Sequence, residues 1–318
     1  TVDNANLLGA TTSGKLTATI ATTETVTELA TLSADGGTND LTIVIRAADA
    51  TAATAAQLNT INDATAVAVN LNNVTALAAS SLADLGTLAT AINASQFSNA
   101  TGLTTIAVSD TTVDATTLAT RIDSYDSING LATTGMTLAS GATIEVEAGE
   151  ITHMLADETA TRLTISDQLI TVNGAITVDN SNLLAATTTG KVTATIDTSE
   201  TVTELATLSA DGGTNDLTIV IRAADATAAT AAQLNTINDA TALAVDLTNV
   251  TALAGSSLAD LGTLATAINA SQFSNAGGLT TIAVTDTTVD ATALAARIDS
   301  YDSINSGSTT GMTLASGA

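Results

Sequence analysis

The chain has 318 residues, of which 32 are acidic and 7 are basic, so its formal net charge at pH 7 is −25. So acidic a surface excludes phosphate backbones and anionic membranes as partners, because clustered lysines and arginines bind both. We therefore expect no nucleic-acid partner. Cysteine is absent, which excludes disulfides, zinc-thiolate sites and cysteine nucleophiles. No uninterrupted apolar run is long enough to cross a bilayer, and we expect no membrane span.

The apolar residues make up 45% of the chain, but only two are phenylalanine, two are tyrosine and none is tryptophan. Much of the remainder is alanine. Each Å² of buried apolar surface contributes roughly 25 cal/mol to stability, and an alanine buries far less of it than a leucine. Stability must therefore accumulate over many thin layers, which is typical of repeat proteins.

An internal duplication dominates the sequence. Residues 1–142 recur as residues 177–318, with 17 differences over 142 aligned positions. The duplication predicts a first long repeat over residues 1–176 and a truncated second copy over residues 177–318, together forming one continuous solenoid. Neither end reads as a capping repeat, since each is copied in the interior. We therefore expect an excerpt of a longer array or a subunit that associates head to tail into a filament.

A shorter unit recurs inside each long repeat, in which a β-branched run precedes an Ala- and Leu-rich helical segment. Residues 41–46 precede a helix over 53–62, residues 65–71 precede one over 81–93, and residues 104–108 precede one over 113–124. In the last helix Asp114 is the predicted N-cap, and Leu118 and Ile122 share one face. One anchor per helix gives six coils: Leu29, Leu58, Leu88, Leu118, Ile151 and Leu183. The gap after Leu183 is short, so either that coil is short or the anchor is misplaced.

These coils predict the fold class. We expect an α/β repeat solenoid with one strand and one short helix per coil of about 29 residues, and a parallel sheet on one side. The alternative is an all-β right-handed parallel β-helix, because Thr and Val favour strands and Ala-rich stretches such as residues 47–56 could be loops.

Acidic side chains gather around the single histidine. If residues 143–147 form a strand, Glu145 and Glu147 share one face of it. Glu150, His153 and Asp157, spaced by three and four residues, would share one face of a following helix. Oxygen ligands with one imidazole could hold a cation. The competing interpretation is a solvated acidic surface. The candidate metal ligands are Glu145, Glu147, Glu150, His153 and Asp157.

A second candidate metal site is the sequence DGGTND, which begins at Asp35 and ends at Asp40, and recurs from Asp211 to Asp216. Such loops occur in calcium-binding β-rolls, where the short repeat recurs in tandem. Here the loop occurs once per long repeat, which favours a simple turn. Calcium is the only cofactor that the sequence suggests.

Catalysis finds few of its usual groups, since there is one histidine, no cysteine, and Lys15 and Lys191 are the only lysines. Paired carboxylates such as Asp123 and Asp126 lack the aromatic platforms and deep cleft that a glycosidase needs. We expect no catalytic residues and no enzyme activity.

Two phrases, AAQLNTINDAT at residues 55–65 and TTVDATTLATRIDSYDS at residues 111–127, resemble units of very large tandem-repeat surface proteins of bacteria, cyanobacteria in particular. The resemblance implies an extracellular or cell-surface adhesin, surface layer, sheath or fibre, and transfers no functional residues. We expect a structural protein that self-associates. The alternative is a calcium-dependent or glycan-binding adhesin module, with cell-surface glycans as partners.

Overall fold

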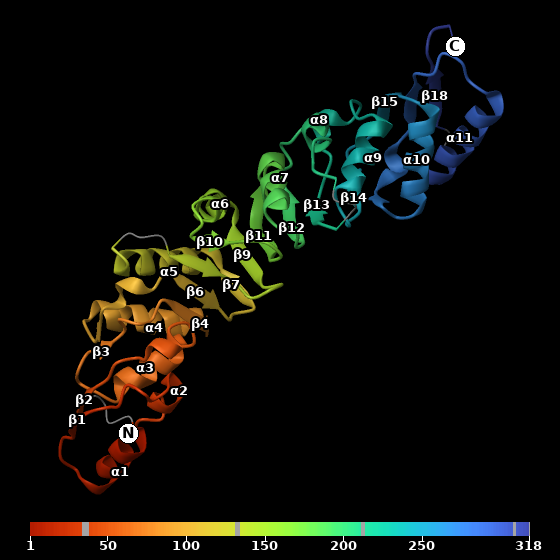
Figure 1. The fold of residues 1–318 in the computed structure, drawn as a ribbon. Helices are drawn as coiled ribbons and strands as arrows, with labels where there is room; N and C mark the ends of the chain where they lie inside the picture. Colours follow the sequence, from red (N-terminus) through yellow and green to blue (C-terminus); the bar gives the residue numbers. More distant parts are fainter. Residues whose placement is uncertain (34–37, 131–133, 211–213, 308–309, 318) are drawn as a thin grey trace. The chain divides into compact units, whose positions relative to one another are not determined.

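The computed structural model describes residues 1–33, 38–130, 134–210, 214–307 and 310–317. The chain forms two compact units, Thr1–Gln168 and Leu169–Ala318. The boundary precedes the sequence repeat boundary at Ile176, because β11 (Leu169–Ile176) pairs with β12 (Val192–Ile196) inside the second unit. Both units are mixed α/β, with short helices and parallel sheets (Figure 1).

The first unit begins with a helix and then alternates strands, short 3₁₀ turns (η) and helices. Its elements are α1 (Val2–Thr11), β1 (Thr17–Thr19), α2 (Val26–Leu29), β2 (Asp40–Thr42), η1 (Ala47–Asp49), α3 (Ala55–Asp63), β3 (Val69–Asn70), β4 (Ala76–Ser80), α4 (Leu82–Asn93), β5 (Phe97–Ser98), η2 (Ala100–Gly102), β6 (Thr105–Val108), β7 (Thr112–Asp114), α5 (Ala115–Ile128), β8 (Gly135–Thr137), β9 (Thr143–Glu147), η3 (Ala148–Glu150), α6 (Ile151–Thr159) and β10 (Leu163–Thr164).

The second unit repeats most of this order. After β11 come α7 (Val178–Thr187), β12, α8 (Val202–Leu205), β13 (Asp216–Thr218), η4 (Ala223–Asp225), α9 (Ala231–Asp239), β14 (Val245–Asp246), β15 (Ala252–Ser256), α10 (Leu258–Asn269), β16 (Phe273–Ser274), η5 (Ala276–Gly278), β17 (Thr281–Val284), α11 (Ala291–Ile304) and β18 (Gly311–Leu314).

Strands pair in parallel with strands that follow a crossover, as the sequence predicts. In the first unit β4, β6, β8 and β10 form one sheet, with Thr105 of β6 opposite Gly135 of β8. In the second unit β12 lies between β11 and β13. Parallel pairing requires a crossover, and a helix supplies most of them. The all-β alternative is therefore wrong, since residues 47–56 contain η1 and the start of α3.

The expectation of one strand per coil is too simple. Between α5 and α6 the chain forms two strands, β8 and β9, and these join different ladders, β8 with β6 and β9 with β7. The predicted strand over residues 65–71 contracts to β3, and β4 follows it before α4. Two-residue strands such as β3 and β5 carry too little sequence signal to be recognised without their partner.

The helix predicted over residues 113–124 is present as α5, but it runs from Ala115 to Ile128 because residues 112–114 form β7; its predicted N-cap and buried face are confirmed. The Asp114 side chain accepts a hydrogen bond from Thr117 N at 2.8 Å, and Leu118 and Ile122 are buried. The Leu183 anchor is wrong, because Leu183 is 51% exposed and its neighbour Leu184 is buried. The coil is also short, as the spacing predicted. Ile170 of β11 pairs with Val192 of β12, a separation of 192 − 170 = 22 residues.

Acidic side chains from a following segment cap several helices. The Asp49 carboxylate accepts a hydrogen bond from Val26 N at the start of α2, at 2.7 Å, and Asp110 accepts one from Leu82 N at the start of α4, at 2.7 Å. A carboxylate there satisfies an orphan N–H and complements the helix dipole. The copies in the second unit repeat both contacts, Val202 N to Asp225 at 2.8 Å and Leu258 N to Asp286 at 2.7 Å. Part of the acidity thus holds successive segments together.

The two copies of one helix differ in burial because different segments follow them. In the first unit α5 contacts β9 and α6, and its Leu118 and Ile122 are buried. In α11, the copy of α5, Leu294 and Ile298 are partly exposed. Residues 112–114 form β7 opposite β9, whereas the identical residues 288–290 form no strand. In the first unit the following segment, β9 and α6, thus covers the apolar face of α5.

Within the described ranges, none of the helices combines the length and the apolar character needed to cross a membrane.

Candidate functional site

The acidic segment around the histidine divides into an exposed part and a buried part. On β9 the Glu145 and Glu147 side chains are exposed and alternate with buried Ile144 and Val146, so the predicted shared face is confirmed. Glu150 and His153 are also exposed, on η3 and α6. Asp157, in contrast, is buried on α6.

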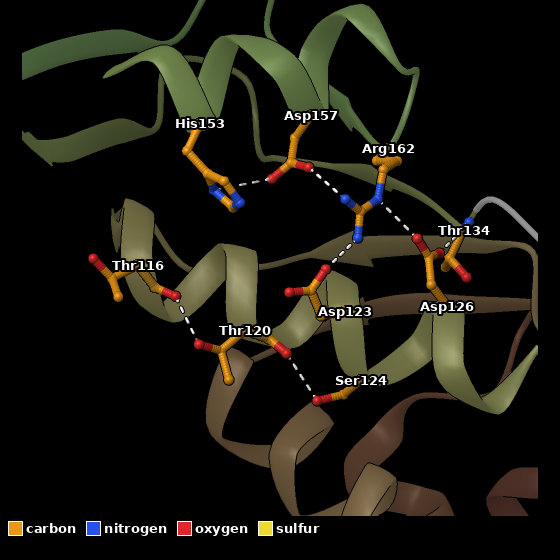
Figure 2. Close-up of polar contacts among 9 residues, drawn as sticks. All are labelled: Thr116, Thr120, Asp123, Ser124, Asp126, Thr134, His153, Asp157 and Arg162. Atoms are coloured by element: carbon orange, nitrogen blue, oxygen red, sulfur yellow. Dashed lines mark hydrogen bonds and ion pairs between the residues drawn. The ribbon is translucent and has the colours of Figure 1, made fainter. Parts of the chain in front are cut away.

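Asp157 belongs instead to a cluster around Arg162, which Figure 2 shows. Arg162 donates from Nε to Asp126 Oδ2 at 2.7 Å, from Nη1 to Asp157 Oδ1 at 2.8 Å, and from Nη2 to Asp123 Oδ1. Two of these carboxylates come from α5 and the third from α6. The His153 imidazole lies 3.9 Å from Asp157, between Nδ1 and Oδ2. We call these residues the Arg162 cluster.

Burial and neighbouring charges shift the pKa values of Asp157 and Arg162. Burial raises the pKa of the Asp157 carboxyl, and the nearby Arg162 and His153 only partly offset this effect. Burial lowers the pKa of Arg162, but hydrogen bonds to Asp123 and Asp126 and the charge of Asp157 outweigh it, so the pKa of Arg162 is raised. The guanidinium stays charged and is surrounded by three carboxylates. This geometry ties α5 to α6.

The metal candidates are not brought together into a ligand set. Among the residues that the structure describes, no three His, Cys, Asp or Glu side chains form a group that could hold a metal ion. Asp40 pairs with Lys15, and its copy Asp216 pairs with Lys191. Asp35 and Asp211 lie outside the described residues.

The structure has a groove over three helices that the sequence did not predict. It lies across α3, α4 and α5, which contact one another in succession (Figure 1). Its volume is about 650 Å³, and Asn59, Asn62, Gly86 and Arg121 are among its lining residues. The second unit holds the same groove across α9, α10 and α11, with a volume of about 770 Å³.

Arg121 lies directly against Gly86 in this groove. A Cβ atom added to Gly86 would lie 2.5 Å from Nη2 and 2.8 Å from Cζ of Arg121. In the second unit a Cβ on Gly262 would lie 2.6 Å from Nη2 of Arg297. Glycine inside a helix costs about 1 kcal/mol relative to alanine. The glycine in an otherwise Ala- and Leu-rich helix, repeated in both copies, is the sequence signal that could have revealed the contact.

The chain matches no protein-family model, no curated protein and no solved structure.

Proposed function

We propose that this chain is an extracellular structural repeat protein, in which the segments stack as one α/β solenoid and self-associate into a fibre, sheath or surface layer. The observation that carries the proposal is the difference between α5 and α11. The same helix is covered where β9 and α6 follow it and is partly exposed where they do not. A surface that is covered by the next segment is the contact from which a solenoid grows.

Strand pairing supports the same proposal. β12 is paired on both sides, by β11 and β13, whereas among the residues that the structure describes its copy β1 is paired with β2 alone. An unpaired strand edge offers a row of backbone donors and acceptors to a further segment, either of the same chain or of another copy. End-to-end association through such edges is heterologous, and heterologous contacts that do not close generate filaments.

The acidic, cysteine-free composition fits a protein that works outside the cell, in a medium whose ions screen its charge. The binding role of a calcium-dependent adhesin gains no support from Asp40 and Asp216, whose carboxylates are paired with lysines. We therefore favour a structural role for the chain over calcium-dependent adhesion.

Sedimentation velocity and electron microscopy at rising protein concentration test the proposal. Two chains are compared: the chain itself and a chain extended after Ala318 by a copy of residues 143–176, which would follow β18 with copies of β9, α6, β10 and β11. We expect the extended chain to form end-to-end rods. Its added copy of β11 can pair with β1 of a second molecule, because β1 is the copy of β12 and β12 pairs with β11.

A matched pair of variants controls for nonspecific association. Leu8→Asp in the extended chain places a charge on the exposed face of α1 and should abolish the rods. Leu183→Asp places the same charge on an exposed position of α7 and should leave them intact. Monomers of both chains at every concentration would overturn the proposal, as would rods that persist in Leu8→Asp.

A further inference from the structure

Two arginines lie in the grooves without a partner. Among the described residues, Arg121 and Arg297 make no hydrogen bond or ion pair, and the Nε atom of each is buried without an acceptor. The other five basic residues are all ion-paired with aspartates: Lys15, Arg46, Arg162, Lys191 and Arg222. In a chain with 32 acidic and 7 basic residues, an unpaired guanidinium is not explained by a shortage of carboxylates.

The guanidinium is held in place by the helix beneath it. Gly86 leaves the space that the Arg121 side chain occupies, and Gly262 does the same for Arg297. A guanidinium positioned in this way is preorganised, since less side-chain entropy is lost when it forms hydrogen bonds. Its planar fork matches a carboxylate, which it can bind through two parallel hydrogen bonds.

The rest of the lining offers acceptors for hydroxyl groups. The Oδ1 atom of Asn59 is buried without a donor, while its Nδ2 donates to Asp84 O at 3.0 Å. The Thr87 and Thr90 hydroxyls donate within α4, to Ala83 O and Gly86 O, so their oxygens can still accept. Amides and hydroxyls beside one guanidinium suit a ligand that carries hydroxyls beside one carboxylate.

Asp63 also lines the groove and is exposed, which disfavours a second negative group on the ligand. The lining residues that the structure describes include no aromatic side chain. Recognition therefore rests on charge and hydrogen bonds rather than on ring stacking. The volume of about 650 Å³ falls in the usual range of small-molecule sites.

We propose that each groove binds a sugar acid, a monocarboxylate with neighbouring hydroxyls, through Arg121 in the first unit and Arg297 in the second. The ligand is either free or a uronic acid residue of a polysaccharide. The chain then has two equivalent sites, one for each copy of the repeat. The inference rests on the grooves alone, so a chain that fails to assemble end to end can still bind.

The test is an NMR titration of the Nε–H signals of the five arginines with glucuronate, at about 0.15 M salt to screen the net charge. We expect saturable shifts of the Arg121 and Arg297 signals, with little change at Arg46, Arg162 and Arg222. Glucose and acetate, each lacking one half of the proposed recognition, should shift these signals at least tenfold less at the same concentration.

Variants then assign each site. Arg121→Gln should remove the first site and leave the shift of Arg297 unchanged, and Arg297→Gln should do the reverse. Lys191→Gln removes the same charge outside the grooves and should leave both sites intact. Gly86→Ala should displace the guanidinium and weaken the first site severalfold without unfolding the chain, because alanine favours the helix.

A short oligoglucuronate distinguishes the two sources of the ligand. Saturation at a lower concentration than glucuronate indicates a polysaccharide, and saturation at the same concentration indicates a free sugar acid. The proposal is overturned if glucuronate leaves both signals unmoved at millimolar concentration, if glucose shifts them equally, or if binding survives in the Arg121→Gln/Arg297→Gln double variant.

Discussion

Leu8 and Leu184 occupy the same position in the two copies of the repeat, yet Leu8 is 52% exposed and Leu184 is fully buried. Their local sequences are nearly identical and both lie in helices, α1 and α7. The difference therefore comes from packing against other segments and not from local sequence. The duplication thus supplies internal controls, because one side chain can be changed in two environments of the same chain.

Truncating this leucine should destabilise the chain only in the second copy. Leu184→Ala deletes a buried side chain and should cost about 3 kcal/mol of unfolding free energy, within the usual range for such cavities. Leu8→Ala should cost less than about 0.5 kcal/mol, as expected of an exposed position. Urea unfolding followed by circular dichroism measures both. Equal losses would contradict the stacked arrangement of α7.

Removing the arginine of the Arg162 cluster should weaken the first unit. Arg162→Gln leaves Asp157 buried without its charge-assisted hydrogen bond, and the expected loss is about 2 kcal/mol at neutral pH. Lys191→Gln breaks an exposed ion pair and should cost less than about 1 kcal/mol. The two variants change the net charge equally, so a similar loss in both would refute a special role for the cluster.

The loss in Arg162→Gln should shrink as the pH falls. Burial already raises the folded-state pKa of Asp157 above its normal value, so the folded chain holds this proton more tightly than the unfolded chain. The stability contributed by the protonated form is present at low pH and is lost as the pH rises through the raised pKa. Removing Arg162 raises that pKa further. Urea unfolding at several acidic pH values tests this, and a loss that grows on acidification would contradict it.

A natural Asn-to-Asp difference predicts an opposite pH dependence. Asn70 Oδ1 accepts hydrogen bonds from Asn72 N and Asn99 Nδ2, and Asp246 Oδ1 accepts them from Thr248 N and Asn275 Nδ2. Burial raises the pKa of Asp246, but the hydrogen bonds from Asn275 and Thr248 outweigh it, so the pKa is lowered. Asp246 therefore stabilises the folded chain above its unfolded-state pKa, and this contribution disappears as the pH falls through the lowered value.

Exchanging these residues between the copies tests the argument. Asp246→Asn should lower the free energy of unfolding at pH 7 by less than about 1 kcal/mol, and with it the melting temperature. In acid the melting temperatures of the variant and the original chain should no longer differ. Asn70→Asp should create the same pH dependence in the first unit. Thermal unfolding of both variants across the acidic range measures it. A difference that persists unchanged into acid would exclude the hydrogen-bonded carboxylate as its cause.

Local sequence was sufficient for α5, because a capping Asp114 and an apolar face at helical spacing both point to the same helix. It was insufficient for β7. Residues 112–114 and 288–290 are identical, but only the first set forms a strand, opposite β9. Pairing with a later segment decides the outcome, and no local propensity contains that information.

In the candidate sites, too, local features were predictable from the sequence and contacts between distant segments were not. The alternation of Glu145 and Glu147 follows from strand geometry and was predictable. The burial of Asp157 was not, because it depends on Arg162 and on two aspartates of another helix. The contact between Gly86 and Arg121 likewise joins side chains of two different helices. A helical glycine indicates a close approach but does not name the residue that approaches.

The two tyrosines give a direct test of packing at high pH. Tyr125 Oη donates to Leu85 O at 3.1 Å, and Tyr301 Oη donates to Leu261 O at 3.1 Å. Both rings are fully buried, and burial raises the pKa of both phenols well above the normal value, although nearby Arg121 and Arg297 oppose it. Their contribution to stability is complete below about pH 10, where unfolded tyrosine titrates, and is lost as the pH rises through the raised pKa.

Ultraviolet absorbance of tyrosinate should therefore stay low at about pH 11 while the chain is folded, and appear when urea unfolds it. Tyr125→Phe and Tyr301→Phe each leave one tyrosine, so the signal of either unit can be read alone. Each variant should also lose about 1 kcal/mol, the usual net contribution of one hydrogen bond. The partly exposed Leu294 and Ile298 leave Tyr301 as the only buried side chain of α11. A normal titration near pH 10 in the folded Tyr125→Phe chain would show that the last helix does not pack as described.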